Sequence, residues 1–244
     1  MICKPFGDEM LCSHRPLRYL AEGLAAAGFP TLRLDYDGTG DSSGDDTDPG
    51  RVPAWLDSIE AGVRELQSRG ARRVALVGVR FGALLAAEYA KRNPVHALVL
   101  IAPPASGRAY VREMRAFQAM RAPTGATAKI EGRPEGDESV GFQLTPATAA
   151  ALEKLSIVGD APPAPNVLIL ARDDLDGHER RLVDKLGKLG ASVTLARPGG
   201  YAAMVMQGDP VKAEVPELMW KHLTGWLSNL GGDARDGVFR TKNE

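Results

Sequence analysis

Two hydrophobic patterns alternate along the chain. Short apolar runs rich in β-branched residues are separated by amphipathic stretches of helix length. The apolar runs predict strands at 1–4, 31–36, 73–79, 97–102, 166–171 and 192–196. The amphipathic stretches predict helices at 15–27, 53–68, 81–92, 178–189 and 216–227. Buried strands that alternate with helices are typical of a parallel sheet with helices on both faces, so the pattern predicts an α/β fold.

One interval, 105–165, breaks this alternation. A helical pattern at 108–121 leads into Gly- and Pro-rich sequence and a second short helix at 146–155. Long insertions in compact domains are usually functional or disordered, so we expect a lid or cap over the ligand face, with a floppy surface insertion as the alternative. The remaining pattern predicts one domain over 1–230, followed by a flexible polar tail at 231–244.

Composition excludes several classes of protein. The 244 residues are 44% hydrophobic and 25% charged, which is typical of a globular protein with a real core. The net charge of -1 does not favour nucleic acid or an anionic membrane, so we expect a small-molecule or carrier-bound partner. Two cysteines, Cys3 and Cys12, and the lack of a long apolar segment indicate a cytoplasmic protein without membrane insertion. No cofactor and no metal site are expected.

The sharpest local signal is Gly78-Val-Arg-Phe-Gly82, which lies between a predicted buried strand and a predicted helix. In a nucleophile elbow, flanking glycines permit a tight strand-to-helix turn that presents the central side chain at the carboxyl edge of the sheet. That central residue is Arg80 here.

With this elbow, the chain resembles the α/β-hydrolase superfamily, and within it the serine-aminopeptidase-like hydrolases that include the exosortase-associated group. The most specific resemblance is in Lys4-Pro-Phe-Gly-Asp-Glu-Met and the stretches 13–21 and 27–42. It implies an α/β-hydrolase fold, a mostly parallel twisted sheet with helices on both faces and a lid insertion. Family members usually have two further strands before the one at 1–4, so the N-terminal strands are expected to be missing. The shortened sheet would leave an unpaired edge, for which we expect a homodimer.

The resemblance also implies site residues. Backbone amides of Phe6 or Gly7 and of Phe81 would form the oxyanion hole. Asp174 occupies the position of the acid, with Asp173 as the fallback. Arg80 stands in the place of the serine nucleophile and Tyr201 in that of the histidine, which argues against ordinary Ser-His-Asp hydrolysis.

Other candidates are weaker. The histidines His14, His96, His178 and His222 all lack the position after a strand that the catalytic histidine has, although His14 and His178 are expected nearer the carboxyl edge. Ser106 either lines the pocket or forms a turn. Cys3 is either a reactive thiol or a buried small residue.

An arginine at the elbow needs an anion. It faces the positive end of a helix dipole, which costs about 0.3–1 kcal/mol, and it can only donate hydrogen bonds and positive charge. The anion is either internal, with Asp174 as the candidate, or a ligand carboxylate, phosphate or oxyanion.

Three functions remain open. The protein is an enzyme in which Arg80 polarises or binds an acyl substrate in a bacterial biosynthetic pathway, or a catalytically silent pseudo-hydrolase that binds a ligand or partner. The third is a different doubly wound domain that uses 38–44 as a phosphate loop, although this loop lacks the spacing of a dinucleotide fingerprint.

Overall fold

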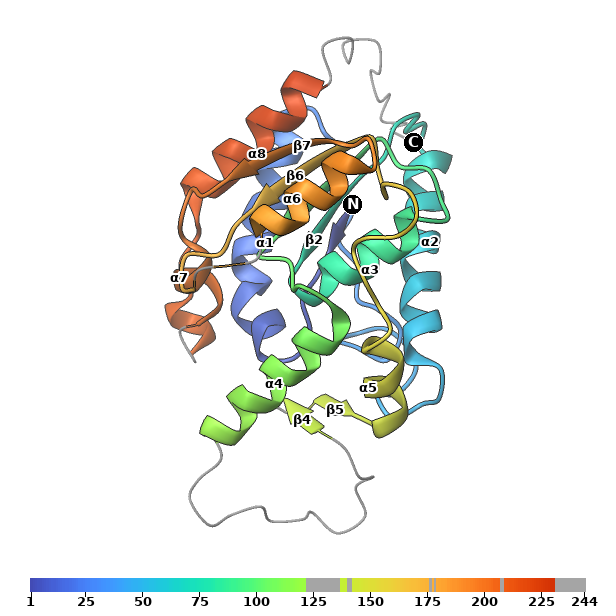
Figure 1. The fold of residues 1–244 in the computed structure, drawn as a ribbon, viewed down its shortest axis with the longest axis vertical. Coiled ribbons are helices and arrows are strands. Elements are labelled where there is room, and N and C mark those ends of the chain that lie inside the picture. Colours follow the sequence, from blue (N-terminus) through green and yellow to red (C-terminus); the bar gives the residue numbers. More distant parts are fainter. Residues whose placement is uncertain (122–136, 140–141, 176, 178, 207–208, 231–244) are drawn as a thin grey trace, which may run out of the picture.

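A computed structural model describes residues 1–121, 137–139, 142–175, 177, 179–206 and 209–230. Its main feature is a five-stranded sheet in the order β1-β2-β3-β6-β7, in which all neighbouring strands are parallel (Figure 1). The strands are β1 (Ile2–Cys3), β2 (Ala75–Val79), β3 (Ala97–Ile101), β6 (Asn166–Leu170) and β7 (Ser192–Ala196). The predicted parallel sheet is confirmed.

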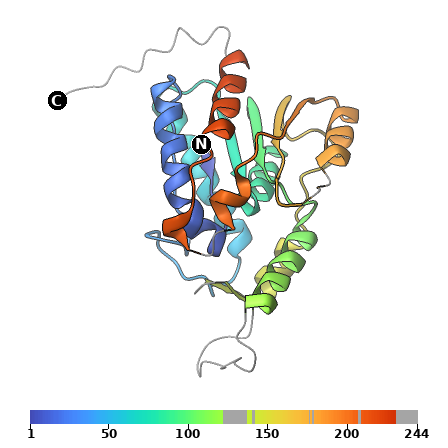
Figure 2. The same ribbon diagram turned by 90° about the vertical axis from the view of Figure 1, so that its left-hand side faces the viewer.

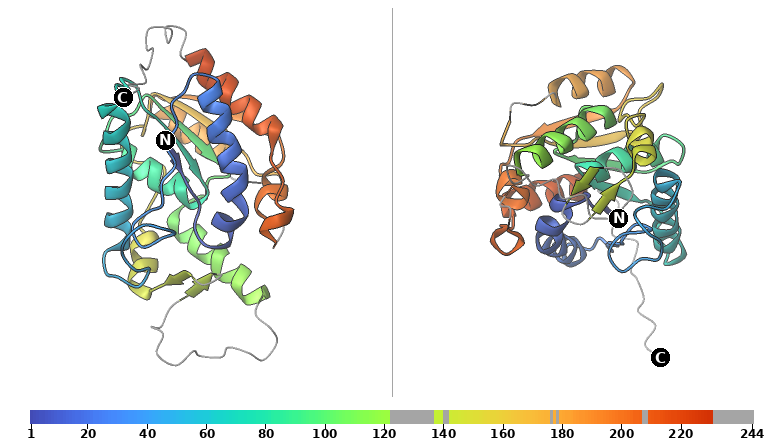
Figure 3. Two further views of the ribbon diagram at one scale, coloured as in Figure 1. Left: turned by 180° about the vertical axis from the view of Figure 1, so that it is seen from behind. Right: turned by 90° about the horizontal axis from the view of Figure 1, so that it is seen from below.

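Helices cover both faces of this sheet, as Figures 2 and 3 show. One layer contains α1 (Asp8–Ala26), α7 (Tyr201–Val205) and α8 (Glu217–Leu230), and the other contains α2 (Arg51–Ser68), α3 (Phe81–Ala90) and α6 (Glu179–Lys188). Successive strand residues point to opposite faces, so Val77 and Val99 pack with the first layer whereas Leu76 and Leu98 pack with the second. The central strands are therefore apolar on both faces, which explains their continuous hydrophobic runs.

Two predicted elements differ from the structure. The strand expected at 31–36 is wrong: only Arg33 forms an isolated bridge, to Ile2. The adjacent β1 is two residues long, and Asp35 is already engaged by Lys4, so the segment has little strand to pair with. The helix expected to begin at residue 15 begins at Asp8, because Pro16 is accommodated inside α1 rather than at its start.

The insertion between β3 and β6 begins with α4 (Gly107–Arg121), which lies on the outer rim of the molecule (Figure 1). It continues with an antiparallel pair, β4 (Asp137–Ser139) and β5 (Phe142–Leu144), and with α5 (Pro146–Leu152). Both helices contribute residues to the core on the side of α2 and α3. The predicted tail at 231–244 lies outside the described residues.

Two further predictions concern surfaces. The outer side of β1 meets residues 32 and 33, where the Ile2 amide donates to the Leu32 carbonyl at 2.9 Å, and the expected homodimer stays a prediction. In the described part of the chain, no helix has the length and apolar character needed to cross a membrane. A short 3₁₀ helix, η1 (Pro210–Lys212), links α7 to α8.

Candidate functional site

The predicted strand-turn-helix lies at the carboxyl edge of the sheet. β2 ends at Val79, α3 begins at Phe81, and Arg80 between them has φ 51° and ψ -113°, a strained conformation for a residue with a side chain. A Cβ on Gly78 would lie 2.5 Å from the Ala83 Cα, and a Cβ on Gly82 would collide with the Cys3 carbonyl. The elbow therefore requires both glycines, because the backbone of the helix packs directly on two strands.

The Arg80 side chain is enclosed by its own chain. It is 2% exposed. Its Nε lies 2.7 Å from Glu9 Oε1 and one terminal nitrogen lies 2.8 Å from Glu113 Oε2. The other terminal nitrogen donates to the Ala102 carbonyl at 3.4 Å, and the guanidinium carbon lies 5.6 Å from the centre of the Tyr110 ring. The anion that an arginine at this position needs is supplied from α1 and α4, and not by Asp174.

A second arginine, Arg172, extends this network. Its Nη1 donates to Glu113 Oε1 at 2.7 Å, so Glu113 bridges both arginines. Its Nε and Nη2 bind Asp174 in a two-point contact at 2.7 and 2.6 Å. The Asp174 carboxylate is thus paired with Arg172, which lies two residues after the end of β6. We call Glu9, Arg80, Glu113, Arg172 and Asp174 the ionic centre.

Protonation states in the ionic centre follow from these contacts. Burial by itself would raise the pKa of Glu113, but Arg80 and Arg172 outweigh it, and the pKa lies below its ordinary value. Burial is likewise outweighed at Asp174, whose pKa is lowered mainly by Arg172. The pKa of Arg80 is raised, since Glu9 and Glu113 overcome its desolvation. Charged forms are therefore favoured at all three groups.

Tyr201, which the sequence predicts in the histidine's place, contacts the ionic centre through Glu9. Its hydroxyl donates to Glu9 Oε1 at 3.2 Å, and its ring lies 5.5 Å from the Arg172 guanidinium carbon. The side chain is fully buried, and burial, followed by the Glu9 charge, raises its pKa well above the ordinary value. A phenol in this state is not a general base at neutral pH.

Asp173, the fallback acid, holds the loop that carries Tyr201. Its carboxylate accepts from the backbone amides of Gly200 at 2.6 Å and Ala202 at 2.9 Å. Gly200 has φ 91°, a left-handed conformation that favours glycine, and it immediately precedes α7. Asp173 therefore caps the short α7 helix and fixes where Tyr201 enters the core.

The predicted oxyanion residues lie around the same edge. Phe6 and Phe81 are buried, with ring centres 5.6 Å apart, and Gly7 with φ 63° directly precedes α1. Their amides remain predicted donors. Ser106 precedes α4, and its Oγ accepts from the Ala109 amide at 3.1 Å, so the interpretation as a turn-forming, capping serine fits better than a pocket-lining one.

The remaining sequence candidates are not part of the ionic centre. His14 is exposed on α1, His222 is exposed on α8, and His96 precedes β3 at the opposite edge of the sheet. His178 lies outside the described residues. Cys3 is fully buried and burial raises its pKa to about 12, so it is a structural residue rather than a reactive thiol.

Sequence reasoning missed Glu9, Glu113 and Arg172. Glu9 lies in the opening motif, Lys4-Pro-Phe-Gly-Asp-Glu-Met. Because an arginine at the elbow needs an anion, the acidic residues of this motif could have been considered as its partners. Glu113 follows Tyr110 by three residues on α4, but no local pattern connects α4 with an elbow thirty residues earlier. Only the packing of the insertion on the carboxyl edge brings Glu113 to Arg80.

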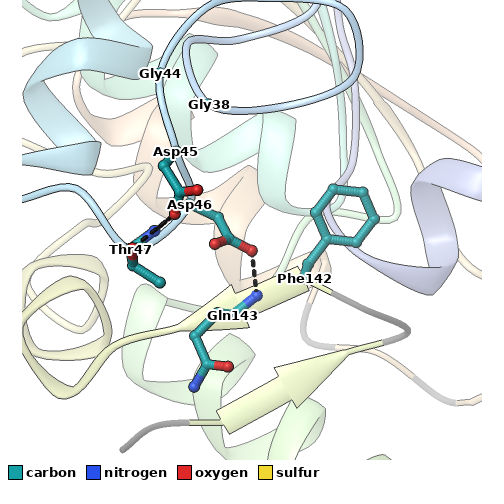
Figure 4. Close-up of a pocket in the computed structure, with 7 residues that line it drawn as sticks. All are labelled: Gly38, Gly44, Asp45, Asp46, Thr47, Phe142 and Gln143. Atoms are coloured by element: carbon teal, nitrogen blue, oxygen red, sulfur yellow. Dashed lines mark hydrogen bonds between the residues drawn. The ribbon is translucent and has the colours of Figure 1, made fainter. Parts of the chain in front are cut away.

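A hollow of about 480 Å³ lies beside the insertion (Figure 4). Its lining comes from the loop before α2 and from β5: Gly38, Gly44, Asp45, Asp46, Thr47, Phe142 and Gln143. The Asp46 carboxylate accepts a hydrogen bond from the backbone amide of Gln143 at 2.5 Å, and the Asp45 carboxylate accepts one from the backbone amide of Thr47 (Figure 4). Arg80, Asp174 and Tyr201 are absent from this lining. The described residues contain no group of three or more His, Cys, Asp or Glu side chains that could hold a metal ion.

A family model described as serine aminopeptidase, S33, matches residues 13–164. The chain belongs to this family. The matched stretch contains most of α1, the elbow and most of the insertion, so the interpretation as an unrelated domain with a phosphate loop is wrong. No curated protein matches the chain.

Solved structures show the same fold. A proline iminopeptidase from Mycobacterium smegmatis has a TM-score of 0.61 at 16% identity, covering 96% of this chain and 90% of that one. Est1E from Butyrivibrio proteoclasticus, bound to ferulic acid, has a TM-score of 0.59 at 18% identity, with 88% and 83% covered. A third match is a structure from work on carboxylesterases of the thaumarchaeon Nitrososphaera gargenis. It has a TM-score of 0.60 at 14% identity and covers 95% of this chain and 90% of that one. This S33 family member therefore has the α/β-hydrolase fold.

Proposed function

We propose that this protein is a catalytically silent member of the S33 family that works by binding. The observation that carries the proposal is the state of Arg80 at the elbow: it is 2% exposed and is paired with both Glu9 and Glu113. An arginine offers no nucleophilic oxygen and keeps its proton, so it cannot replace a serine. Tyr201 is a buried phenol and not an imidazole, so it does not supply a base at the position predicted for the histidine.

In this proposal the ionic centre has a structural role. Arg80 comes from the elbow, Glu9 from α1, Glu113 from α4, and Arg172 and Asp174 from the loop after β6. Its ion pairs of 2.6 to 2.8 Å connect these four segments. The centre would therefore act as a clasp that holds the insertion against the carboxyl edge of the sheet, where the family's substrate would enter.

The second candidate is binding of an acyl or carboxylated small molecule by Arg80, in the cytoplasmic biosynthetic setting that the sequence suggests. A ligand carboxylate is the natural partner of a guanidinium. Such a ligand would have to displace the Glu9 or Glu113 carboxylate from Arg80. The present geometry favours the silent function because both carboxylates lie within 2.8 Å of the guanidinium.

Active-site labelling tests the proposal. The purified protein should not react with a fluorophosphonate probe and should not hydrolyse short-chain p-nitrophenyl esters above the rate in buffer. A serine esterase of the same fold, treated in parallel, provides the positive control. Stoichiometric labelling of any serine, including Ser106, would contradict the proposal.

A further inference from the structure

The two edges of the main sheet differ in how their backbone groups are used. At one edge, the Ile2 amide of β1 donates to the Leu32 carbonyl at 2.9 Å, and Ile2 forms a bridge with Arg33. At the other edge, β7 pairs with β6, and in the described part of the chain no strand pairs with the outer side of β7 (Figure 1). Ser192 and Thr194 of β7 are exposed, whereas every residue of β3 is buried. β7 is therefore the open edge of the sheet.

The ladder with β6 fixes which backbone groups of β7 point outward. The Ser192 amide donates to the Pro165 carbonyl at 2.8 Å, so Ser192 directs its backbone groups toward β6. Successive residues of a strand direct their backbone groups to opposite sides, so the amide and carbonyl groups of Val193 and Leu195 point away from β6. Among the residues that the structure describes, these four groups have no hydrogen-bond partner.

β7 also lacks the features that protect an open edge from pairing. Edge strands in natural proteins commonly carry a charged residue, a proline or a bulge. The sequence of β7 is Ser-Val-Thr-Leu-Ala, without a charge or a proline, and its five residues pair with β6 in an unbroken register. Valine and threonine favour the extended conformation. The strand is therefore suited to accept a further strand on its outer side.

We propose that β7 of a second copy of this chain pairs with β7 in an antiparallel, two-fold arrangement that joins the two sheets into one. The outward groups of Val193 and Leu195 lie symmetrically about Thr194. If Thr194 lies opposite its own counterpart, Val193 of each copy exchanges two hydrogen bonds with Leu195 of the other, and all four outward groups are paired. The edge is therefore complementary to itself. This inference goes beyond the proposed function and is independent of whether the protein is catalytic.

The helix beside this edge favours a second copy over an unrelated extended peptide. The Trp226 indole of α8 donates to Thr194 Oγ1 at 3.1 Å, so α8 lies next to the centre of the proposed interface. Residues 223–230 of α8 include no charged side chain, Trp226 is only partly buried, and Gly225 is exposed. Two copies of this surface can meet at the two-fold axis without like-charge repulsion and cover both indoles. A peptide that paired with β7 alone would bring no such surface.

Cysteine crosslinking tests the register. The two Thr194 residues would form a non-hydrogen-bonded pair with Cα atoms about 4.5 Å apart, which a disulfide can bridge. Under mild oxidation, T194C should therefore form a covalent dimer on a non-reducing gel. The matched control is S192C, an exposed position on the same face of β7 whose counterpart would lie about 13 Å away along the strand, so it should stay monomeric on the gel. The native Cys3 and Cys12 are buried.

Light scattering measures association of the unmodified protein. At micromolar concentration the wild type should have twice the mass of the chain. T194K should raise the dissociation constant of the dimer at least about tenfold, because it places two like charges directly opposite each other at the axis. The buffer contains about 0.3 M NaCl, since α6 beside β7 carries exposed cations that would repel those of its copy: Arg180, Arg181, Lys185 and Lys188.

A wild-type protein that stays monomeric throughout the micromolar range would overturn the inference. A dimer that T194K leaves intact would do the same, and so would equal crosslinking of S192C and T194C, because both outcomes place the contact elsewhere. A monomer that dimerises only after removal of residues 231–244 would assign the edge to the chain's own C-terminal segment, which also contradicts the inference. Failure of the proposed function gives a separate signal, namely labelling or ester hydrolysis by the wild-type protein.

Discussion

The arginines on the two sides of α4 differ in burial and in ion pairing. Beneath the helix, Arg80 and Arg172 are almost completely buried, and each contacts two carboxylates. On top of it, Arg108 and Arg112 are exposed and lack an ion pair among the described residues. A buried charge without a partner costs several kcal/mol, whereas water solvates an exposed one. Partners are therefore obligatory below the helix, whereas above it water takes their place.

The strongest way to break this comparison is to remove Arg80. R80A leaves Glu9 and Glu113 close together without their shared cation, so the free energy of unfolding should fall by about 3–5 kcal/mol. Urea denaturation measures the change. R64A, which removes an exposed arginine from a surface pair on α2, is the control and should cost less than about 1 kcal/mol. A loss of similar size in both variants would show that the ionic centre is no more than a surface network.

The pairing within the ionic centre is tested by double-mutant cycles. Arg80 contacts Glu113 directly, whereas Asp174 contacts Arg172, so R80A and E113A should be coupled by about 1–3 kcal/mol. Coupling between R80A and D174A should be clearly smaller. A larger coupling of R80A with D174A than with E113A would show that Asp174, the predicted acid, pairs with Arg80 after all.

The pH dependence of stability distinguishes the two sides as well. The pKa values of Glu113 and Asp174 are lowered in the folded protein, so their contribution is complete above the ordinary carboxyl pKa of about 4 and disappears as the pH falls through the folded values. Unfolding free energies should therefore drop below about pH 4. E113Q should make this drop shallower, whereas R108A should leave its shape unchanged. An unaltered acid limb in E113Q would contradict the assignment.

The smallest expected effect lies on the upper face. R108E replaces a cation by an anion in the first turn of α4 and removes the repulsion with Arg112, so it should stabilise the protein by about 0.3–1 kcal/mol. Thermal or urea unfolding measures it. A destabilised R108E would mean that Arg108 has a partner within its own chain.

Local patterns were sufficient for most of the fold. The central strands and the elbow follow from apolar runs and from two glycines, because these signals depend only on neighbouring residues. The strand at 31–36 failed for a tertiary reason, since its only partner, β1, is too short to extend the ladder beyond Arg33. The start of α1 was missed because Pro16 is tolerated inside it.

The sequence alone placed Arg80 in a strand-to-helix turn and predicted that a guanidinium there needs an anion; that Tyr201 takes the histidine's place stays a prediction from the resemblance. Which anion serves was decided by tertiary structure. Glu9 and Glu113 lie 71 residues before and 33 residues after Arg80, and although Glu9 belongs to the opening motif, no local pattern pairs either residue with Arg80. Ion pairs form between side chains that packing brings within 3 Å, and packing of α1 and α4 on the sheet edge is a property of the whole chain.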